Sequence, residues 1–380
     1  MAVGTSTTNM ATSYPCQRKS FYAAGRFWVF YGNGTYMVYC TSTDGATWSS
    51  ATTVKTGGAG FYFDVYFDGT YVHYAFADGG AGHDLIYRRG TPNSDGTITW
   101  SAEQIAYDAV YVKNVQQEYL NYPSVTTDSN GYPFISFTYY ESVNAVRLTY
   151  ITKSSTNDGT WATASGFPME LSNVYTYISA VVRMTSGKVY AVWDTSISTL
   201  SQGPLKGKLW DGTSLGSEET VSIGNVQTLG YFSALAIGDV VHVFYLNSYY
   251  NLRWCKRDDT WTDSALTAAT TSTTAPVVSA DGNNLYMFYA GYPTANHIYY
   301  RKYDGSNWGT AVDLIDESTE VLTGNDKLTC YYNKYGNYIG LVYMTKTASP
   351  YNVKFAYLSL AAPPSAALRM VGDGLTLVIY

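Results

Sequence analysis

Seven glycine-containing turns recur along this chain of 380 residues, at spacings of 44 to 62 residues. Each turn follows one apolar stretch and precedes another that is rich in aromatic residues, so each marks a hairpin between two strands. A repeat of this length constrains the fold more than any local pattern does. The hairpin glycines are Gly25, Gly69, Gly131, Gly187, Gly238, Gly282 and Gly336.

The stretch after each glycine has the Tyr, Phe and Val content of a buried strand. The spacing is close to the roughly 40 to 50 residues of a four-stranded propeller blade. The sequence therefore predicts an all-β protein, a seven-bladed β-propeller of four-stranded antiparallel blades covering residues 1–360. The second strands are expected at Phe27–Tyr31, Tyr71–Ala77, Pro133–Tyr139, Val189–Trp193, Val240–Tyr245, Leu285–Tyr289 and Tyr338–Tyr343.

The two ends of the chain bear on how the ring closes. The seventh unit has no fourth strand before Pro363, and an open sheet edge invites aggregation. We expect residues 1–9 to supply the closing strand of the last blade. Residues 361–380 form a Pro/Ala linker and a short C-terminal β-hairpin tail. This tail either packs on its own propeller, where it could replace the N-terminal strand, or adds to a neighbouring copy.

The turns after the third strands carry a second recurring marker, a short polar sequence that ends in tryptophan. Ser42–Trp48 contains Ser, Asp, Gly, Thr and Trp and resembles, one residue shorter, the Asp box (BNR repeat) of sialidase-like propellers. The resemblance implies the propeller fold and says little about activity. We expect Asp44 to hold its turn and Trp48 to pack between neighbouring sheets.

The composition excludes several classes of function. A net charge of −6 gives no electrostatic footprint for nucleic acid or an anionic membrane, and no apolar run reaches the roughly 20 residues that span a bilayer. Residues 1–12 lack the pattern of a signal peptide. We expect an extracellular, cell-surface or virion location, reached after removal of a signal or by cell lysis.

Motifs for metals and cofactors are missing from the sequence. Cys16, Cys40, Cys255 and Cys330 lie in different repeats without a Cys/His cluster, which predicts buried free thiols and no zinc site. Asp78–Asp84 lacks the spacing of a calcium loop, and there is no phosphate loop. We expect no metal and no cofactor.

Alignment on the hairpin glycines brings one set of side chains to the same level near one channel mouth. Asp64 lies two residues further in, on a level with several serines. Four phenols, one cation and one carboxylate around such a funnel suit a shallow sugar-binding mouth. The alternative is that the tyrosines only close the channel. The predicted ligand-binding residues are Arg18, Tyr62, Asp64, Tyr122, Tyr177 and Tyr231.

The sialidase resemblance also suggests an enzyme, which can be tested by residue. That family uses three arginines, a Tyr–Glu pair and an acid/base Asp. Arg18 matches one arginine, Asp64 could be the acid/base group, and Glu118 or Glu141 could pair with a ring tyrosine. The other two arginines are missing from the expected positions. We therefore predict no catalytic residue, with Asp64, Glu118 and Glu141 as the candidates if the chain is a glycosidase.

Our interpretation is a non-catalytic propeller that serves adhesion, glycan binding or assembly through a Tyr-rich face. Its partners would be glycans or another cell-surface polymer, and possibly copies of itself through residues 361–380. Two alternatives stay open. One is a glycoside hydrolase of sialidase-like fold, and the other is a purely structural, self-assembling subunit.

Overall fold

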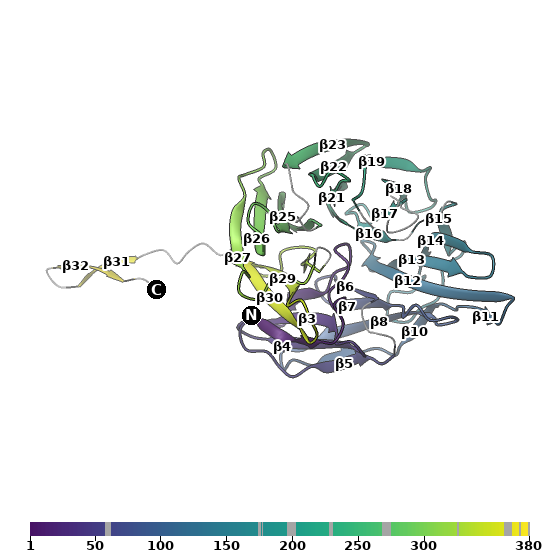
Figure 1. Ribbon diagram of the computed structural model, residues 1–380, viewed down its shortest axis with the longest axis horizontal. Helices are drawn as coiled ribbons and strands as arrows, with labels where there is room; N and C mark the ends of the chain where they lie inside the picture. The colour runs from purple at the N-terminus through teal and green to yellow at the C-terminus, as the bar shows by residue number, and fades with distance from the viewer. Residues whose placement is uncertain are drawn as a thin grey trace.

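The computed structural model describes residues 1–57, 62–173, 176, 178–195, 203–227, 231–267, 275–324 and 327–360, and the backbone of residues 367–371 and 374–378. Every regular element in these residues is a strand, and no helix among them could span a membrane. The strands form seven antiparallel sheets around a ring, with a separate two-stranded sheet in the tail (Figure 1). The predicted fold, a seven-bladed β-propeller, is confirmed.

The first three blades follow the chain from inner to outer strand. Blades 2 and 3 each carry a short fifth strand, β9 (Ile98–Trp100) beside β8 and β11 (Tyr111–Val112) beside β12. Blade 1 is β2 (Ser20–Ala23), β3 (Arg26–Gly32), β4 (Met37–Ser42) and β5 (Thr52–Lys55); blade 2 is β6 (Phe63–Phe67), β7 (Val72–Phe76), β8 (Leu85–Pro92) and β10 (Gln104–Tyr107); blade 3 is β12 (Gln116–Thr127), β13 (Pro133–Glu141), β14 (Val146–Lys153) and β15 (Met169–Ser172).

The remaining blades have four strands each, and the last is completed by the first strand of the chain. Blade 4 is β16 (Ser179–Arg183), β17 (Val189–Asp194), β18 (Pro204–Trp210) and β19 (Glu219–Asn225); blade 5 is β20 (Phe232–Ile237), β21 (Val240–Leu246), β22 (Leu252–Asp258) and β23 (Thr260–Thr267); blade 6 is β24 (Val277–Asp281), β25 (Asn284–Ala290), β26 (His297–Tyr303) and β27 (Val312–Asp316); blade 7 is β28 (Thr329–Cys330), β29 (Tyr338–Thr345), β30 (Tyr351–Ser359) and β1 (Ala2–Ser6).

The core lies between the blades, because each sheet packs on the sheets before and after it. The second strands are buried on both faces, which explains their continuous aromatic and β-branched sequences. Phe21 of blade 1 stacks on Phe67 of blade 2 with ring centroids 4.8 Å apart. All four cysteines are buried and unpaired, as the sequence predicts.

The tryptophans of the polar turns reach the preceding blade. The ring of Trp48 lies 5.1 Å from Phe355 of blade 7, and that of Trp161 lies 5.1 Å from Tyr87 of blade 2. Trp100 differs and packs on Tyr74 of its own blade. The carboxylate of Asp44 accepts hydrogen bonds from the backbone N–H groups of residues 46 and 47, both at 2.8 Å, and therefore holds the turn.

The ring is closed by β1, which pairs with β30 as the outer strand of blade 7. The N-terminal ammonium of Met1 donates to the carbonyl oxygen of Phe355 at 2.8 Å. At the other end of β1, the Ser6 hydroxyl donates to the carbonyl oxygen of Gly32 in blade 1 at 2.7 Å. In the tail, β31 (Ala367–Val371) and β32 (Gly374–Val378) pair with each other and with no other described strand. Figure 1 draws this hairpin away from the blades.

Candidate functional site

The ring topology brings the N-terminal segment across one face of the propeller. Because β1 is an outer strand and β2 an inner one, residues 7–19 must run inward over the face that carries the loops between blades. There the ring of Tyr14 meets Tyr122 edge-on at 5.1 Å, and Tyr122 meets Tyr62 in the same way at 5.0 Å. We call this cluster of Tyr14, Tyr62 and Tyr122 the tyrosine mouth. Two of the predicted site residues therefore do come together.

Tyr122 adopts a backbone conformation that is unusual for a large side chain. Its φ of 50° lies in the left-handed region, at a shift of register between β12 and β13. Bulges of this kind redirect a side chain, and strained residues concentrate at functional sites. Tyr62 and Tyr122 are both partly buried, so neither residue is fully covered by the protein. The N-terminal segment narrows this mouth, and Tyr14 was not foreseen from the repeats.

The other members of the predicted ring have different surroundings. Tyr231 is half-buried and packs against the apolar core between blades. Tyr177 lies outside the described residues. Arg18 is only 4% exposed, and its guanidinium donates to the carbonyl oxygen of Ala234 in blade 5 at 2.9 Å. It also lies over the ring of Tyr332, 5.6 Å from the centroid. Arg18 is therefore a brace across the channel.

Asp64 and the serines on its level connect neighbouring blades. The carboxylate of Asp64 accepts hydrogen bonds from the backbone N–H groups of Arg18 in blade 1 and of Val125 in blade 3, the second at 2.8 Å. Ser124 accepts in the same way from Val181 of blade 4 at 3.3 Å. Burial raises the pKa of Asp64, and the bonds from Val125 and Arg18 and the nearby Lys19 only partly oppose it. This level of the channel is structural.

A second buried cation, Lys19, lies beside Asp64. Its ammonium is fully buried, donates to Gln17 Oε1 at 3.1 Å and to the carbonyl oxygen of Phe63, and sits 3.6 Å from the centre of the Phe63 ring. Burial lowers the pKa of Lys19, and the charge of Asp64 opposes this only in part. The space beside Arg18 measures about 10 Å³, room for about one water molecule. Among the described residues, Arg18, Asp64 and Tyr332 thus leave little space at this level of the channel.

The two glutamates proposed for an enzyme are held by their own blade. Glu118 accepts from the Val110 N–H at 2.9 Å with one oxygen and from the Tyr139 hydroxyl at 3.1 Å with the other. Glu141 accepts from the N–H groups of residues 143 and 144 at 2.8 and 2.7 Å. Burial alone would raise the pKa of Glu141, but these backbone bonds outweigh it and the pKa is lowered. Both carboxylates hold loop segments at the end of β12 and β13 that lies away from their Gly131 turn.

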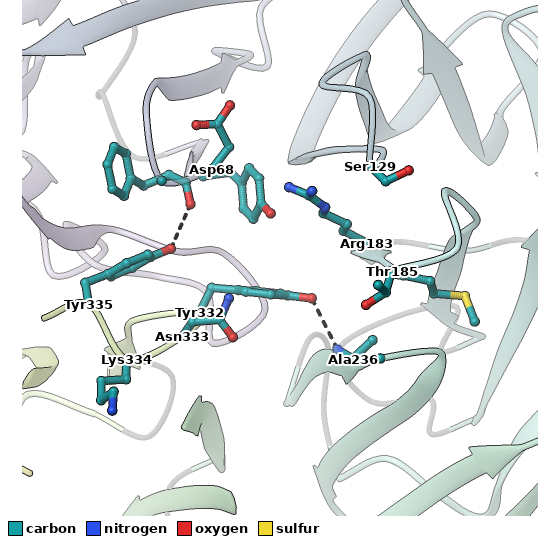
Figure 2. A pocket seen from close by; sticks show the side chains of 14 residues that line it. Asp68, Ser129, Arg183, Thr185, Ala236, Tyr332, Asn333, Lys334 and Tyr335 are labelled. Atoms are coloured by element: carbon teal, nitrogen blue, oxygen red, sulfur yellow. Dashed lines mark hydrogen bonds between the residues drawn. The ribbon is translucent and has the colours of Figure 1, made fainter. Parts of the chain in front are cut away.

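The opposite end of the channel has the open cavity. Its walls are the hairpins that carry the repeat glycines, and its volume is about 430 Å³. Figure 2 shows Arg183 and Tyr332 reaching into this space, which we call the hairpin mouth. It was missed from the sequence because Arg183 comes from a single blade and has no counterpart in the repeats. The side chains that define it are Tyr66, Ser129, Arg183, Thr185, Tyr332, Asn333 and Tyr335.

Comparison with known proteins bears on the fold. No family model matches the sequence, and no curated protein matches it. The polysaccharide lyase Uly1 has a TM-score of 0.55 at 9% identity, over 91% of this chain and 90% of that one. An ulvan lyase of a new polysaccharide lyase family, bound to -[GlcA(1-4)Rha3S]-, gives 0.55 at 10% identity, over 94% and 96%. The likeness is one of fold.

A lectin with fewer blades is also similar. The six-bladed fucose-binding lectin of Aleuria aurantia has a TM-score of 0.48 at 13% identity, over 93% of this chain and 99% of that one. The resemblance of Ser42–Trp48 to the Asp box of sialidases stays a prediction.

Proposed function

We propose that the protein is a non-catalytic glycan-binding propeller that acts outside the cell or on a virion surface, with the tyrosine mouth as its binding face. The observation that carries this is the pair Tyr62 and Tyr122, partly buried tyrosines whose rings are in edge-on contact, with Tyr122 held at a bulge. Phenol rings offer a flat apolar surface with a hydrogen-bonding rim, which suits the mixed faces of a sugar. Polysaccharide lyases share the fold, which favours glycans as the ligand class.

The hydrogen bonds of the three candidate carboxylates favour binding over catalysis. Both oxygens of Asp64, of Glu118 and of Glu141 accept at least one hydrogen bond from the protein. A general acid or nucleophile must be free to reach the glycosidic bond, and these groups are committed to the backbone or to a neighbouring phenol. A glycosidase of this fold would need other residues.

The test is a glycan array followed by titration calorimetry on the best ligand. Tyr62→Ala should weaken binding by at least about fivefold, since it removes the stacking surface, whereas Tyr62→Phe should retain most of the affinity. Tyr249, an exposed tyrosine on another loop, offers the matched control Tyr249→Ala. Equal affinity in Tyr62→Ala, or loss only in Tyr249→Ala, would refute a site at the tyrosine mouth.

A second candidate function is assembly, which a different surface favours. Apolar side chains gather at the end of blade 3, where Val110, Tyr111, Val112, Val115 and Val143 are 41% to 65% exposed. Exposed apolar groups in one place mark contact surfaces. The C-terminal hairpin, whose strands pair only with each other among those described, could add to such an edge on a neighbouring copy.

A further inference from the structure

The hairpin mouth differs from the other hollows by its charge. A rim hollow of similar volume, about 440 Å³, lies between blades 1 and 2. Its basic side chains are already paired: His83 lies 2.8 Å from Asp78, and Lys55 contacts Glu103. The hairpin mouth, at about 430 Å³, falls in the size range of small-molecule sites and contains a cation with no such pair.

That cation is Arg183, at the end of inner strand β16. Its side chain is half-buried and points into the cavity (Figure 2). Among the described residues no carboxylate forms an ion pair with it. Burial lowers the pKa of Arg183, but the nearby Tyr66 and Asp68 outweigh this and raise it, so the guanidinium is always charged. A fixed, planar fork of N–H donors is suited to an oxyanion.

Tyr332 faces the same space from blade 7 and supplies a second donor. Its hydroxyl oxygen accepts the backbone N–H of Ala236 at 3.2 Å, so the hydroxyl proton remains available (Figure 2). In contrast, the Tyr335 hydroxyl already donates a hydrogen bond to the carbonyl oxygen of Phe67 at 2.8 Å. Arg183 and Tyr332 together present donors from two sides of one cavity.

Asp68 is a carboxylate in the lining of the cavity, and both of its oxygens already have partners in the protein. Asp68 accepts the N–H groups of Thr70 and Tyr71 with one oxygen, both at 2.7 Å, and lies 3.1 Å from His73 Nε2 with the other. Lys334 is neutralised by Asp281 at 2.7 Å. The uncharged polar groups of the lining include the hydroxyls of Ser129 and Thr185 and the amide of Asn333, beside apolar and aromatic side chains such as Phe67 and Met184. Asp68 disfavours a bare, multiply charged anion, whereas a ligand with one charge and several hydroxyls fits this lining.

We propose that the hairpin mouth is a second binding site, separate from the tyrosine mouth, and that it takes a carboxylate-bearing sugar, a hexuronic acid unit. Arg183 and the Tyr332 hydroxyl bind the carboxylate. Ser129, Thr185 and Asn333 bind ring hydroxyls, and the rings of Tyr66, Tyr332 and Tyr335 form the walls. The site is independent of the proposed function, because none of its lining residues belongs to the tyrosine mouth.

The test is titration calorimetry with D-glucuronate and D-galacturonate, using glucose, galactose and acetate as partial ligands. One of the two uronates should bind more tightly than its neutral sugar and more tightly than acetate. Arg183→Gln should weaken that binding by at least about tenfold, because a charge-assisted bond is lost, and Arg183→Lys should give an intermediate loss. Lys334→Gln is the matched control, since it removes a lining cation that is already paired, and should change affinity less than threefold.

Two further measurements show whether a loss of uronate binding comes from this site and not from unfolding or from the tyrosine mouth. Thermal unfolding of Arg183→Gln should match the wild type, because no ion pair is lost. Tyr62→Ala should leave uronate binding unchanged, which separates this site from the tyrosine mouth. The proposal is overturned if neither uronate binds, if acetate binds as tightly as the better uronate, or if Arg183→Gln and Lys334→Gln have equal effects.

Discussion

The guanidinium of Arg18 donates a hydrogen bond at 2.9 Å to the carbonyl oxygen of Ala234, 216 residues further along the chain. The bond joins blade 1 to blade 5 across the channel. It explains why this arginine can be almost fully buried without a carboxylate partner among the residues that the structure describes: the carbonyl, the Tyr332 ring and the Cys330 sulfur surround its charge. Arg18 separates the two mouths and does not line an open site.

The first prediction follows from this brace. Arg18→Gln should lower the free energy of unfolding by about 2 kcal/mol, because a charged hydrogen bond is lost and Ala234 keeps a buried carbonyl. Urea denaturation measures it. Arg26→Gln, which removes a partly buried arginine whose hydrogen bond to the Ser94 carbonyl is exposed to solvent, should change stability by less than about 0.5 kcal/mol. A stable Arg18→Gln protein with impaired glycan binding would restore Arg18 to the ligand site.

The second prediction concerns pH and Lys19. Its pKa is lowered from 10.5 to about 7, chiefly by burial. Between those values the unfolded chain binds more protons at this group than the folded protein does. The contribution of Lys19 to stability must therefore rise with pH in that window, by up to about 1.4 kcal/mol per pH unit.

Comparison with Lys19→Met isolates this effect. Buried thiols and tyrosines, whose pKa values are raised, pull the total the other way above about pH 8.5. The difference in unfolding free energy, wild type minus variant, should therefore increase from pH 7 to pH 9. A difference that stays constant over this range would show that the pKa of Lys19 is not lowered in the folded protein.

The third prediction assigns a structural role to the first polar turn. Trp48→Ala should cost about 3 kcal/mol of stability, because the ring packs on Phe355 of the neighbouring blade. Asp44→Ala should also destabilise, since its carboxylate holds two backbone N–H groups. Neither change should alter the affinity for a glycan or a uronate. Lost binding in a folded Asp44→Ala protein would contradict the assignment.

The repeats made most of the fold predictable, but they did not predict the contacts of individual side chains. The second strands fall at the predicted positions because burial on both faces leaves a continuous apolar sequence. The glycine alignment also placed Asp64 on an inner strand, which is β6. The alignment could not show that the Arg18 side chain crosses the channel, because the rotamer of Arg18 depends on its contacts with the blades on the other side.

The candidate site was harder to foresee for the same reason. Asp64 and Ser124 occupy equivalent positions and both accept an N–H from the next blade, so equivalence along the repeat marked a structural contact. Tyr14 lies outside the repeats and reaches the mouth only through the closure by β1. Arg183 occurs once, and no periodic pattern singles it out. Tyr14 and Arg183, which have no counterparts in the other repeats, are the residues that give the two mouths their character.

The last prediction separates the two ends of the chain. Deleting residues 1–9 removes β1 and leaves the edge of β30 unpaired, with the loss of the Met1–Phe355 and Ser6–Gly32 bonds. An unpaired apolar edge promotes aggregation, so this variant should unfold at a lower temperature and aggregate. Deleting residues 361–380 removes only a hairpin whose strands pair with each other, and should leave the unfolding temperature unchanged.

Light scattering after size exclusion measures the oligomeric state of the wild type and of both deletion variants. If the tail joins copies, wild type should be an oligomer and the tail deletion a monomer; a monomer in both would refute assembly through the tail. Unfolding caused by the tail deletion, with a stable N-terminal deletion, would mean that the C-terminal hairpin closes the ring.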